Sequence, residues 1–178
     1  MRRVTVVSYD PHWPRAFAAA AGEVATALGV QRQDVHHIGS TSIVGMAAKP
    51  VIDMLAVVTN LAALDARVAG MESLGYEPMG EFGIPGRRYF RRDNGAGERT
   101  HQVHAFLRGS PHVERHLAFR DFMRSHSDCA QSYSDLKQRL AAEHPTDIEA
   151  YMDGKDAFIK EMEVRALAWR SRDDAKGR

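Results

Sequence analysis

The segment that decides the fold occupies residues 36–53 and reads HHIGSTSIVGMAAKPVID. Residues 35–38 form a run that is too short for a helix and are predicted to be a strand. A small polar turn of residues 39–42 follows directly. Pro50 favours an extended backbone at the residue before it. The almost continuous apolar run of residues 51–58 then predicts a central strand that is covered on both faces.

These residues supply the parts of a site for an anion and a metal ion. Gly39 lets the backbone approach a phosphate closely, and the N-terminus of a short helix after it favours negative charge. Three hydroxyl groups, on Ser40, Thr41 and Ser42, stand in the same turn. Asp53 would hold the Mg²⁺ that neutralises the phosphate. The alternative interpretation is a polar turn that only caps a helix.

Asp53 is the one charged residue in the apolar strand that contains it. A buried carboxylate without compensation costs several kcal/mol, so this residue needs a partner or access to a polar surrounding. Two interpretations are open: an arginine partner that serves the structure, or a polar cleft that the carboxylate faces. We favour the cleft.

The rest of the chain predicts an α+β protein in which a mixed sheet is followed by helices only. Asn94-Gly95 is a strong signal for a hairpin between two strands. The further predicted elements are helices over residues 13–28, 61–74, 112–125, 128–143 and 147–169, and strands over residues 88–92 and 99–107. We therefore expect a core over residues 1–110, C-terminal helices packed on it over residues 111–170, and a frayed polar tail over residues 171–178.

The composition is that of an ordinary globular protein. Of 178 residues, 44% are hydrophobic and 26% are charged, which excludes a disordered, collagenous or disulfide-scaffold protein. Lys and Arg number 24 against 23 Asp and Glu, and the resulting net charge of +1 argues against long nucleic acid as a partner. The single cysteine, Cys129, forms no internal disulfide. With no signal-peptide pattern and no long apolar run, we expect a cytoplasmic protein without a membrane partner.

The sequence resembles the GrpB family, whose members are placed by fold in the polymerase-β-like nucleotidyltransferase superfamily. The most specific match is the block from His37 to Ser42 together with residues 49–53, and the resemblance covers residues 9–160. Further matching positions are Tyr9-Asp10-Pro11, Trp13-Pro14, Phe17, Arg88-Tyr89-Phe90, His104, Phe119-Arg120-Asp121, Tyr133, Lys137, Tyr151 and Lys155. The resemblance implies a nucleotidyltransferase-like mixed sheet with flanking helices, and a nucleotide or another phosphate-bearing small molecule as the ligand.

The resemblance also implies a metal site, from which this sequence departs at two positions. The superfamily pattern has a second carboxylate two residues after the first, and a third on a later strand. Here Leu55 takes the second position, and residues 99–106 contain no acid. His104 is the expected replacement because imidazole binds first-row ions well. Asp53 and His104 are therefore the predicted catalytic residues and ligands of a divalent metal, Mg²⁺ or Mn²⁺; a hydrogen-bonded structural histidine is the alternative.

Hydroxyl and basic residues make up the predicted phosphate site. By resemblance, the phosphate-binding set is Gly39, Ser40, Thr41, Ser42, Lys49 and Arg88. An arginine fork grips phosphate through two hydrogen bonds, whereas a solvated edge strand gives the same sequence pattern. Lys137 and Lys155 would reach a triphosphate in the cleft, but helix lysines are more often solvated.

Three functions fit these residues. The first is metal-dependent nucleotidyl transfer from a nucleoside triphosphate to an acceptor that the sequence does not identify. The second is a catalytically degenerate module that binds a nucleotide or a related metabolite, and the missing carboxylates favour it. The third is a metal-dependent hydrolase that uses a histidine-rich version of the same cleft.

Overall fold

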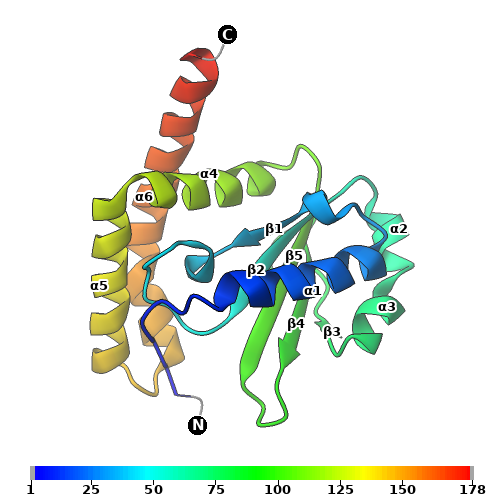
Figure 1. The fold of residues 1–178 in the computed structure, drawn as a ribbon, viewed down its shortest axis with the longest axis horizontal. Coiled ribbons are helices and arrows are strands. Elements are labelled where there is room, and N and C mark those ends of the chain that lie inside the picture. Colours follow the sequence, from blue (N-terminus) through cyan, green and yellow to red (C-terminus); the bar gives the residue numbers. More distant parts are fainter. Residues whose placement is uncertain (1–2, 177–178) are drawn as a thin grey trace.

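The computed structural model describes residues 3–176 and contains a five-stranded mixed sheet with helices on both faces (Figure 1). The strands are β1 (Val35–Ile38), β2 (Ile52–Val58), β3 (Glu77–Pro78), β4 (Arg88–Asp93) and β5 (Arg99–Leu107). The helices are α1 (Trp13–Leu28), α2 (Leu61–Asp65), α3 (Val68–Ser73), α4 (Pro111–Ser125), α5 (Ser127–Glu143) and α6 (Ile148–Lys176), with short 3₁₀ turns η1 (Arg32–Asp34) and η2 (Ser40–Ser42).

The order of the strands in the sheet is β1-β2-β5-β4-β3, and only β2 and β5 run parallel to each other. The register pairs Asp53 with Ile38 on one side and with Gln102 on the other. Because directly opposed residues share a face and side chains alternate along a strand, these three residues lie on one face of the sheet. We call it the Asp53 face.

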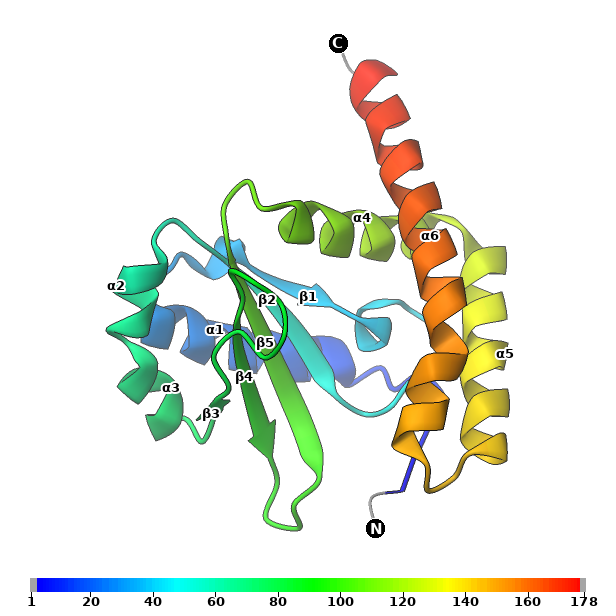
Figure 2. The ribbon, with the colours of Figure 1, turned by 180° about the vertical axis from the view of Figure 1, so that it is seen from behind.

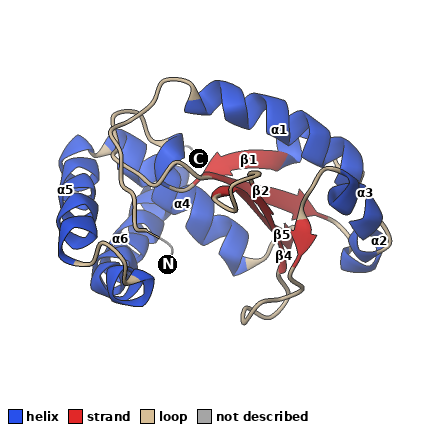
Figure 3. Ribbon diagram, turned by 90° about the horizontal axis from the view of Figure 1, so that it is seen from below, coloured by secondary structure: helices blue, strands red, loops and turns tan. Residues whose placement is uncertain are grey.

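Each face of the sheet has its own core. Helices α1, α2 and α3 cover the face opposite Asp53, where Val24, Met54 and Phe90 belong to one buried cluster. On the Asp53 face, Val113 and Leu117 of α4 pack against a second cluster of Ile38, Leu55, Val57 and Phe106. Figure 3 shows α1 and α4 on opposite sides of the sheet. Helices α5 and α6 pack with α4 beside the sheet (Figure 2).

Local sequence signals explain several of the helix ends. Gly29 ends α1 in the left-handed region at φ 69°, where a residue without Cβ is favoured. Ser110 caps α4 because its side chain accepts a hydrogen bond from the amide of His112, and Pro111 occupies the first turn.

The predicted α+β architecture is confirmed, and two elements differ from the prediction. The predicted helix over residues 61–74 is two short helices, because Arg67 leaves the helical region at φ −110° and ψ 8°. The last helix continues to Lys176 instead of ending at Trp169, and the side chains of Ser171 and Arg172 donate hydrogen bonds to backbone carbonyls four residues earlier in it. The expected frayed tail is thus helical up to residue 176, and residues 177–178 lie outside the described part.

Candidate functional site

Gly39 and Asp53 meet where β1 passes into the η2 turn. Gly39 adopts φ 69° and ψ −177°, a conformation that is essentially confined to glycine. A Cβ at this position would lie 2.5 Å from Oδ2 of Asp53. Glycine is therefore required here for two reasons: the backbone conformation of the turn and the close approach of the Asp53 carboxylate. Ser40 follows it at the start of η2.

Gly39→Ala is expected to destabilise the fold by about 1–3 kcal/mol and to displace the Asp53 carboxylate, because it adds both backbone strain and a steric clash. Urea unfolding measures the loss. Gly45→Ala adds strain without a clash, since Gly45 has φ 79° and open space around it, and Gly95→Ala adds neither. A Gly39 variant no less stable than the Gly95 variant would contradict this account of the turn.

A lysine from the C-terminal helices reaches the η2 turn. Lys137 of α5 donates a hydrogen bond from Nζ to Oγ of Ser40 at 2.7 Å. Its side chain is only 2% exposed, and its ammonium group lies 4.3 Å from the ring centroid of Tyr133. The segment after the turn supports this contact, because Ile43 and Met46 belong to the same core cluster as residues of α4, α5 and α6.

A second lysine, from α6, approaches Asp53 from the same side. Lys155 is 7% exposed, and its Nζ lies 4.5 Å from the ring centroid of Tyr151. Lys49, from the segment before β2, lies 5.3 Å from the same ring. Helices α5 and α6 pack closely here, since a Cβ on Gly154 would lie 2.5 Å from Leu140. We call Ser40, Lys49, Asp53, Lys137 and Lys155 the lysine cluster.

Burial shifts the pKa values of this cluster toward neutrality. It raises the pKa of Asp53 to about 7, although the charges of Lys49 and Lys155 oppose the rise. It lowers the pKa of Lys137 to about 7 and that of Lys155 to about 8, and in each case a neighbouring lysine adds to the effect. Two ammonium groups that are poorly solvated and repel each other gain from an anionic ligand. The negative charge of Asp53 partly opposes the lowering of the pKa of Lys155.

The other two hydroxyls of the predicted phosphate set close the turn instead. The Thr41 hydroxyl donates to the carbonyl of Val51 at 3.1 Å and lies 3.0 Å from Nε2 of His37. Ser42 donates to the carbonyl of Gly39 at 2.6 Å. Both side chains are buried, so the structure brings Gly39, Ser40, Lys49 and Asp53 together and uses Thr41 and Ser42 to hold the turn.

His104 lies on the Asp53 face of β5, two residues beyond the partner of Asp53 in the register. Its Nδ1 is 3.4 Å from Nη1 of Arg87, and its ring packs against Tyr89 and His116 at centroid distances of 5.1 and 5.7 Å. Burial and the charge of Arg87 lower the pKa of His104 to about 3. No group of three His, Cys, Asp or Glu side chains able to hold a metal ion occurs within the described residues. The two-residue metal site of Asp53 and His104 stays a prediction.

Arg88 lies away from the lysine cluster. It pairs with Ala105 in the sheet, which places it on the face opposite Asp53. There its Nε and Nη2 donate to the two carboxylate oxygens of Asp65 at 2.6 and 2.8 Å. The strand alternation therefore removes Arg88 from the predicted phosphate set, and the arginine beside His104 is the preceding residue, Arg87.

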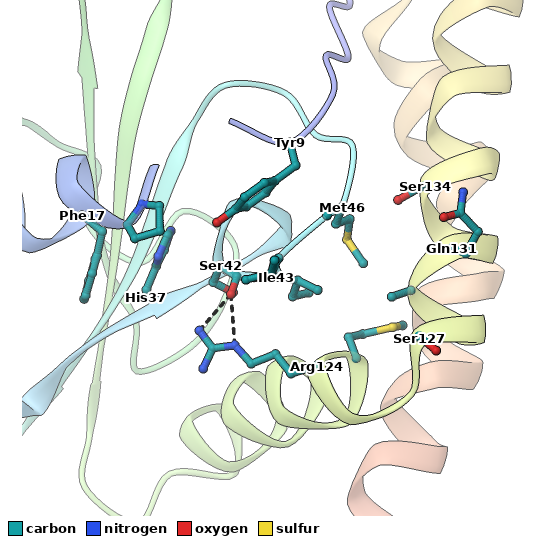
Figure 4. Close-up of a pocket in the computed structure, with 15 residues that line it drawn as sticks. Tyr9, Phe17, His37, Ser42, Ile43, Met46, Arg124, Ser127, Gln131 and Ser134 are labelled. Atoms are coloured by element: carbon teal, nitrogen blue, oxygen red, sulfur yellow. Dashed lines mark hydrogen bonds between the residues drawn. The ribbon is translucent and has the colours of Figure 1, made fainter. Parts of the chain in front are cut away.

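A pocket of about 600 Å³ lies behind the η2 turn, toward α1 (Figure 4). Its wall includes Phe17 and His37, whose rings stack 4.6 Å apart, and the segment from Ser42 to Met46. Arg124 of α4 closes one side and donates two hydrogen bonds to the carbonyl of Ser42. His37 pairs with Met54 and therefore points away from the Asp53 face, whereas Arg124 and Ser134 come from α4 and α5, so the pocket lies beside the end of β1.

Two residues of the lysine cluster, Lys137 and Lys155, are not in the phosphate-binding set predicted from the sequence. Each follows a tyrosine by four residues, Tyr133 and Tyr151, and this spacing places both members of a pair on one helix face. The repeated Tyr-x-x-x-Lys spacing was the available signal. It did not reveal that both lysines point into the protein, because the packing of α5 and α6 against the turn decides that.

Comparisons with known proteins identify the family. A family model described as GrpB protein matches residues 3–165. The chain belongs to the GrpB family. UPF0157 protein YqkA of Bacillus subtilis is 44% identical to it over 177 residues, which cover 99% of this chain and 51% of YqkA. This GrpB chain thus spans about half the length of that relative.

Solved structures place the GrpB chain in its fold class. The crystal structure of the conserved protein GrpB from Enterococcus faecalis has a TM-score of 0.85 and 41% identity, covering 93% of this chain and 99% of that one. Cid1 poly(U) polymerase with MgGTP bound has a TM-score of 0.52 and 10% identity, covering 77% of this chain and 44% of that one. The second likeness concerns the fold alone. Both the predicted family and the nucleotidyltransferase-like fold are therefore confirmed.

None of the helices in the described part of the GrpB chain is both long and apolar enough to cross a bilayer.

Proposed function

We propose that this GrpB chain binds a nucleoside triphosphate at the lysine cluster, with the outer phosphates on Ser40, Lys137 and Lys155. The contact of 2.7 Å between Lys137 and Ser40 carries the proposal, because it sets a buried cation and a hydroxyl side by side at a glycine turn. Phosphate oxygens accept hydrogen bonds from such donors, and their negative charge would neutralise the ammonium groups of the two lysines. The fold shared with Cid1, a polymerase solved with MgGTP bound, supports a nucleotide as the ligand.

Within the described part of the chain, the residues around Asp53 include no group of three His, Cys, Asp or Glu side chains that could hold a divalent ion. They provide one carboxylate, and the neighbouring charged groups are the ammonium groups of Lys49 and Lys155. Leu55, on the same face, is fully buried in an apolar cluster. Mg²⁺ requires about six oxygen ligands, so a metal at Asp53 would depend on oxygens from a bound ligand. The lysines therefore carry the phosphate binding in this proposal, and no step passes through a metal.

The same arrangement would serve nucleotidyl transfer, with Asp53 as a general base. An oxygen of the acceptor would attack the α-phosphorus, and the bond to the bridging oxygen of pyrophosphate would break. The acceptor proton would move to the Asp53 carboxylate, whose pKa of about 7 suits a base at neutral pH. Charge on the departing pyrophosphate would be stabilised by Lys137 and Lys155.

A binding module without catalysis is the second candidate, and the position of Leu55 favours it. This side chain packs with Ile38 and Phe106 at the place where the superfamily pattern has its second carboxylate. Measurement of pyrophosphate release across a panel of acceptors separates the two functions. Release that depends on an acceptor supports transfer, whereas tight binding without release supports the module.

Calorimetric titration of ATP and of inorganic tripolyphosphate tests the proposed function. Each is titrated in EDTA, in Mg²⁺ and in Mn²⁺. We expect both to bind in EDTA, because the lysines supply the positive charge. Binding that appears only with Mn²⁺ would instead favour the predicted metal site of Asp53 and His104. Failure of both compounds to bind under every condition would overturn the proposal.

Affinity for tripolyphosphate is expected to fall as the pH rises above about 7. Burial leaves Lys137 with a pKa of about 7, so it loses its charge in this range unless the ligand restores the proton. Binding at about pH 8 should therefore take up a proton, which calorimetry detects in two buffers of different ionisation enthalpy. An affinity that is constant from about pH 6 to pH 8.5, without proton uptake, would show that Lys137 does not contact the phosphates.

A further inference from the structure

One aromatic side chain stands exposed at the edge of the Asp53 face. Phe82, in the loop between β3 and β4, is 58% exposed and has the left-handed value φ 44°. It is the only aromatic among the exposed large hydrophobic residues of the described part, and the only residue there with positive φ that is not glycine. Both features are unfavourable for a bulky residue unless its surroundings enforce them.

The surrounding loop, residues 79–87, fixes Phe82 in this position. Ile84 packs on the apolar cluster of the Asp53 face together with residues of α4. Arg87 is 7% exposed and donates from Nη2 to the carbonyl of Phe82 at 2.6 Å and from Nε to the carbonyl of Glu81 at 3.1 Å. The buried Arg87 thus fixes the backbone of the loop that carries the exposed ring of Phe82. Figure 2 shows this loop beside β4.

Phe82 is connected to Asp53 through Tyr89. The rings of Phe82 and Tyr89 are 5.4 Å apart, and the negative charge of Asp53 contributes to the raised pKa of Tyr89. Tyr89 stands on β4 and Asp53 on β2, with β5 between them. Tyr89 pairs with His104, which pairs with Leu55, so two strand spacings and an offset of two residues separate the backbone of Tyr89 from that of Asp53 by about 12 Å. Across the sheet, the lysine cluster therefore lies beside Asp53 on β2, and the exposed ring of Phe82 lies beside Tyr89 on β4.

We propose that Phe82 is the stacking surface for the base of the nucleoside triphosphate whose phosphates bind the lysine cluster. This inference rests on the proposed function and assigns the part of the ligand that the lysines leave unbound. With the α-phosphate near Asp53, the nucleoside extends across β5 toward β4, and its base meets the ring of Phe82. Stacking accepts any base, since every base has a π-face, so this contact recognises a nucleotide without selecting one base.

The test titrates ATP, UTP and tripolyphosphate into the wild type, Phe82→Ala and Phe82→Tyr. We expect Phe82→Ala to bind ATP and UTP about tenfold more weakly. Phe82→Tyr should bind them like the wild type, because it keeps the ring. Tripolyphosphate should bind all three proteins equally. Val44→Ala is the matched control, since Val44 is 78% exposed and lies on the pocket behind the turn.

The outcomes distinguish this inference from the proposed function. If Phe82→Ala binds ATP as tightly as the wild type, the stacking role is overturned while the triphosphate site stands. If it loses ATP and tripolyphosphate equally, the loop supports the fold of the site and the stacking role is again overturned. If the wild type binds neither compound, both the proposed function and this inference fail. Weaker binding of ATP and UTP to the alanine variant alone supports stacking.

Discussion

Replacing Lys137 by methionine is expected to weaken tripolyphosphate binding about 100-fold. The substitution removes a charge-assisted donor from the 2.7 Å contact with Ser40, and hydrogen bonds to charged groups contribute up to about 3 kcal/mol. Calorimetry in EDTA measures the loss. Lys160→Met is the matched control, because Lys160 is a solvent-exposed lysine on α6 that pairs with Asp156. We expect that variant to bind like the wild type.

Lys137→Met is expected to be as stable as the wild type or more stable by up to about 2 kcal/mol. Methionine fills the space of the lysine stem without a charge that burial disfavours. Since the pKa of Lys137 is about 7 in the folded protein and higher in the unfolded chain, the destabilisation is complete below about pH 7 and vanishes above about pH 10. The gain from methionine should shrink as the pH rises through this range. Loss of binding together with loss of stability would mark Lys137 as a structural residue.

Asp53→Asn is expected to separate binding from catalysis. Without the carboxylate charge beside the phosphates, tripolyphosphate should bind about tenfold more tightly at about pH 8, with a smaller gain at about pH 6, where Asp53 is already largely protonated. Any release of pyrophosphate should fall about 100-fold or more, because general bases contribute 10²–10⁴-fold. Calorimetry and a pyrophosphate assay on one preparation measure both effects.

The alternatives for Asp53 predict the opposite change in binding. If Asp53 is a metal ligand, Asp53→Asn loses nucleotide affinity, and the loss depends on Mn²⁺ or Mg²⁺. Glu72→Gln provides a control for removal of a negative charge elsewhere, since Glu72 is an exposed residue of α3, on the face opposite Asp53. Weaker binding in Asp53→Asn, in EDTA and with unchanged stability, would contradict the role of Asp53 as an opposing charge and general base.

Much of the fold can be predicted from the sequence because its signals are local. The strand over residues 35–38, the helix over 13–28 and the strand over 99–107 have the predicted bounds. Gly29 and the Asn94-Gly95 turn mark ends that do not depend on distant residues. The split of the predicted helix over residues 61–74 escaped prediction because Leu64 and Met71, which both pack in the core, are seven residues apart and fit one unbroken helix equally well.

The candidate site was less predictable because it depends on contacts between distant segments. Gly39, Ser40 and Asp53 lie within one stretch of sequence, so their roles and the contact between the turn and the strand could be predicted. Ser40 and Lys137 are 97 positions apart, and the packing of α5 on the turn decides their contact. Strand alternation alone did not predict which face of the sheet Arg88 occupies, because that depends on how β4 pairs with β5. In the structure Arg88 pairs with Ala105, so it lies on the face opposite Asp53.

The most direct test of the account is a crystal structure of this chain with α,β-methylene ATP, which keeps a triphosphate but resists cleavage at the α-phosphate. We expect phosphate oxygens within hydrogen-bonding distance of Ser40 Oγ, Lys137 Nζ and Lys155 Nζ. The contact between Lys137 and Ser40 would then open to admit them. A triphosphate bound instead in the pocket beside Arg124, with Lys137 still donating to Ser40, would show that the lysine cluster is not the triphosphate site.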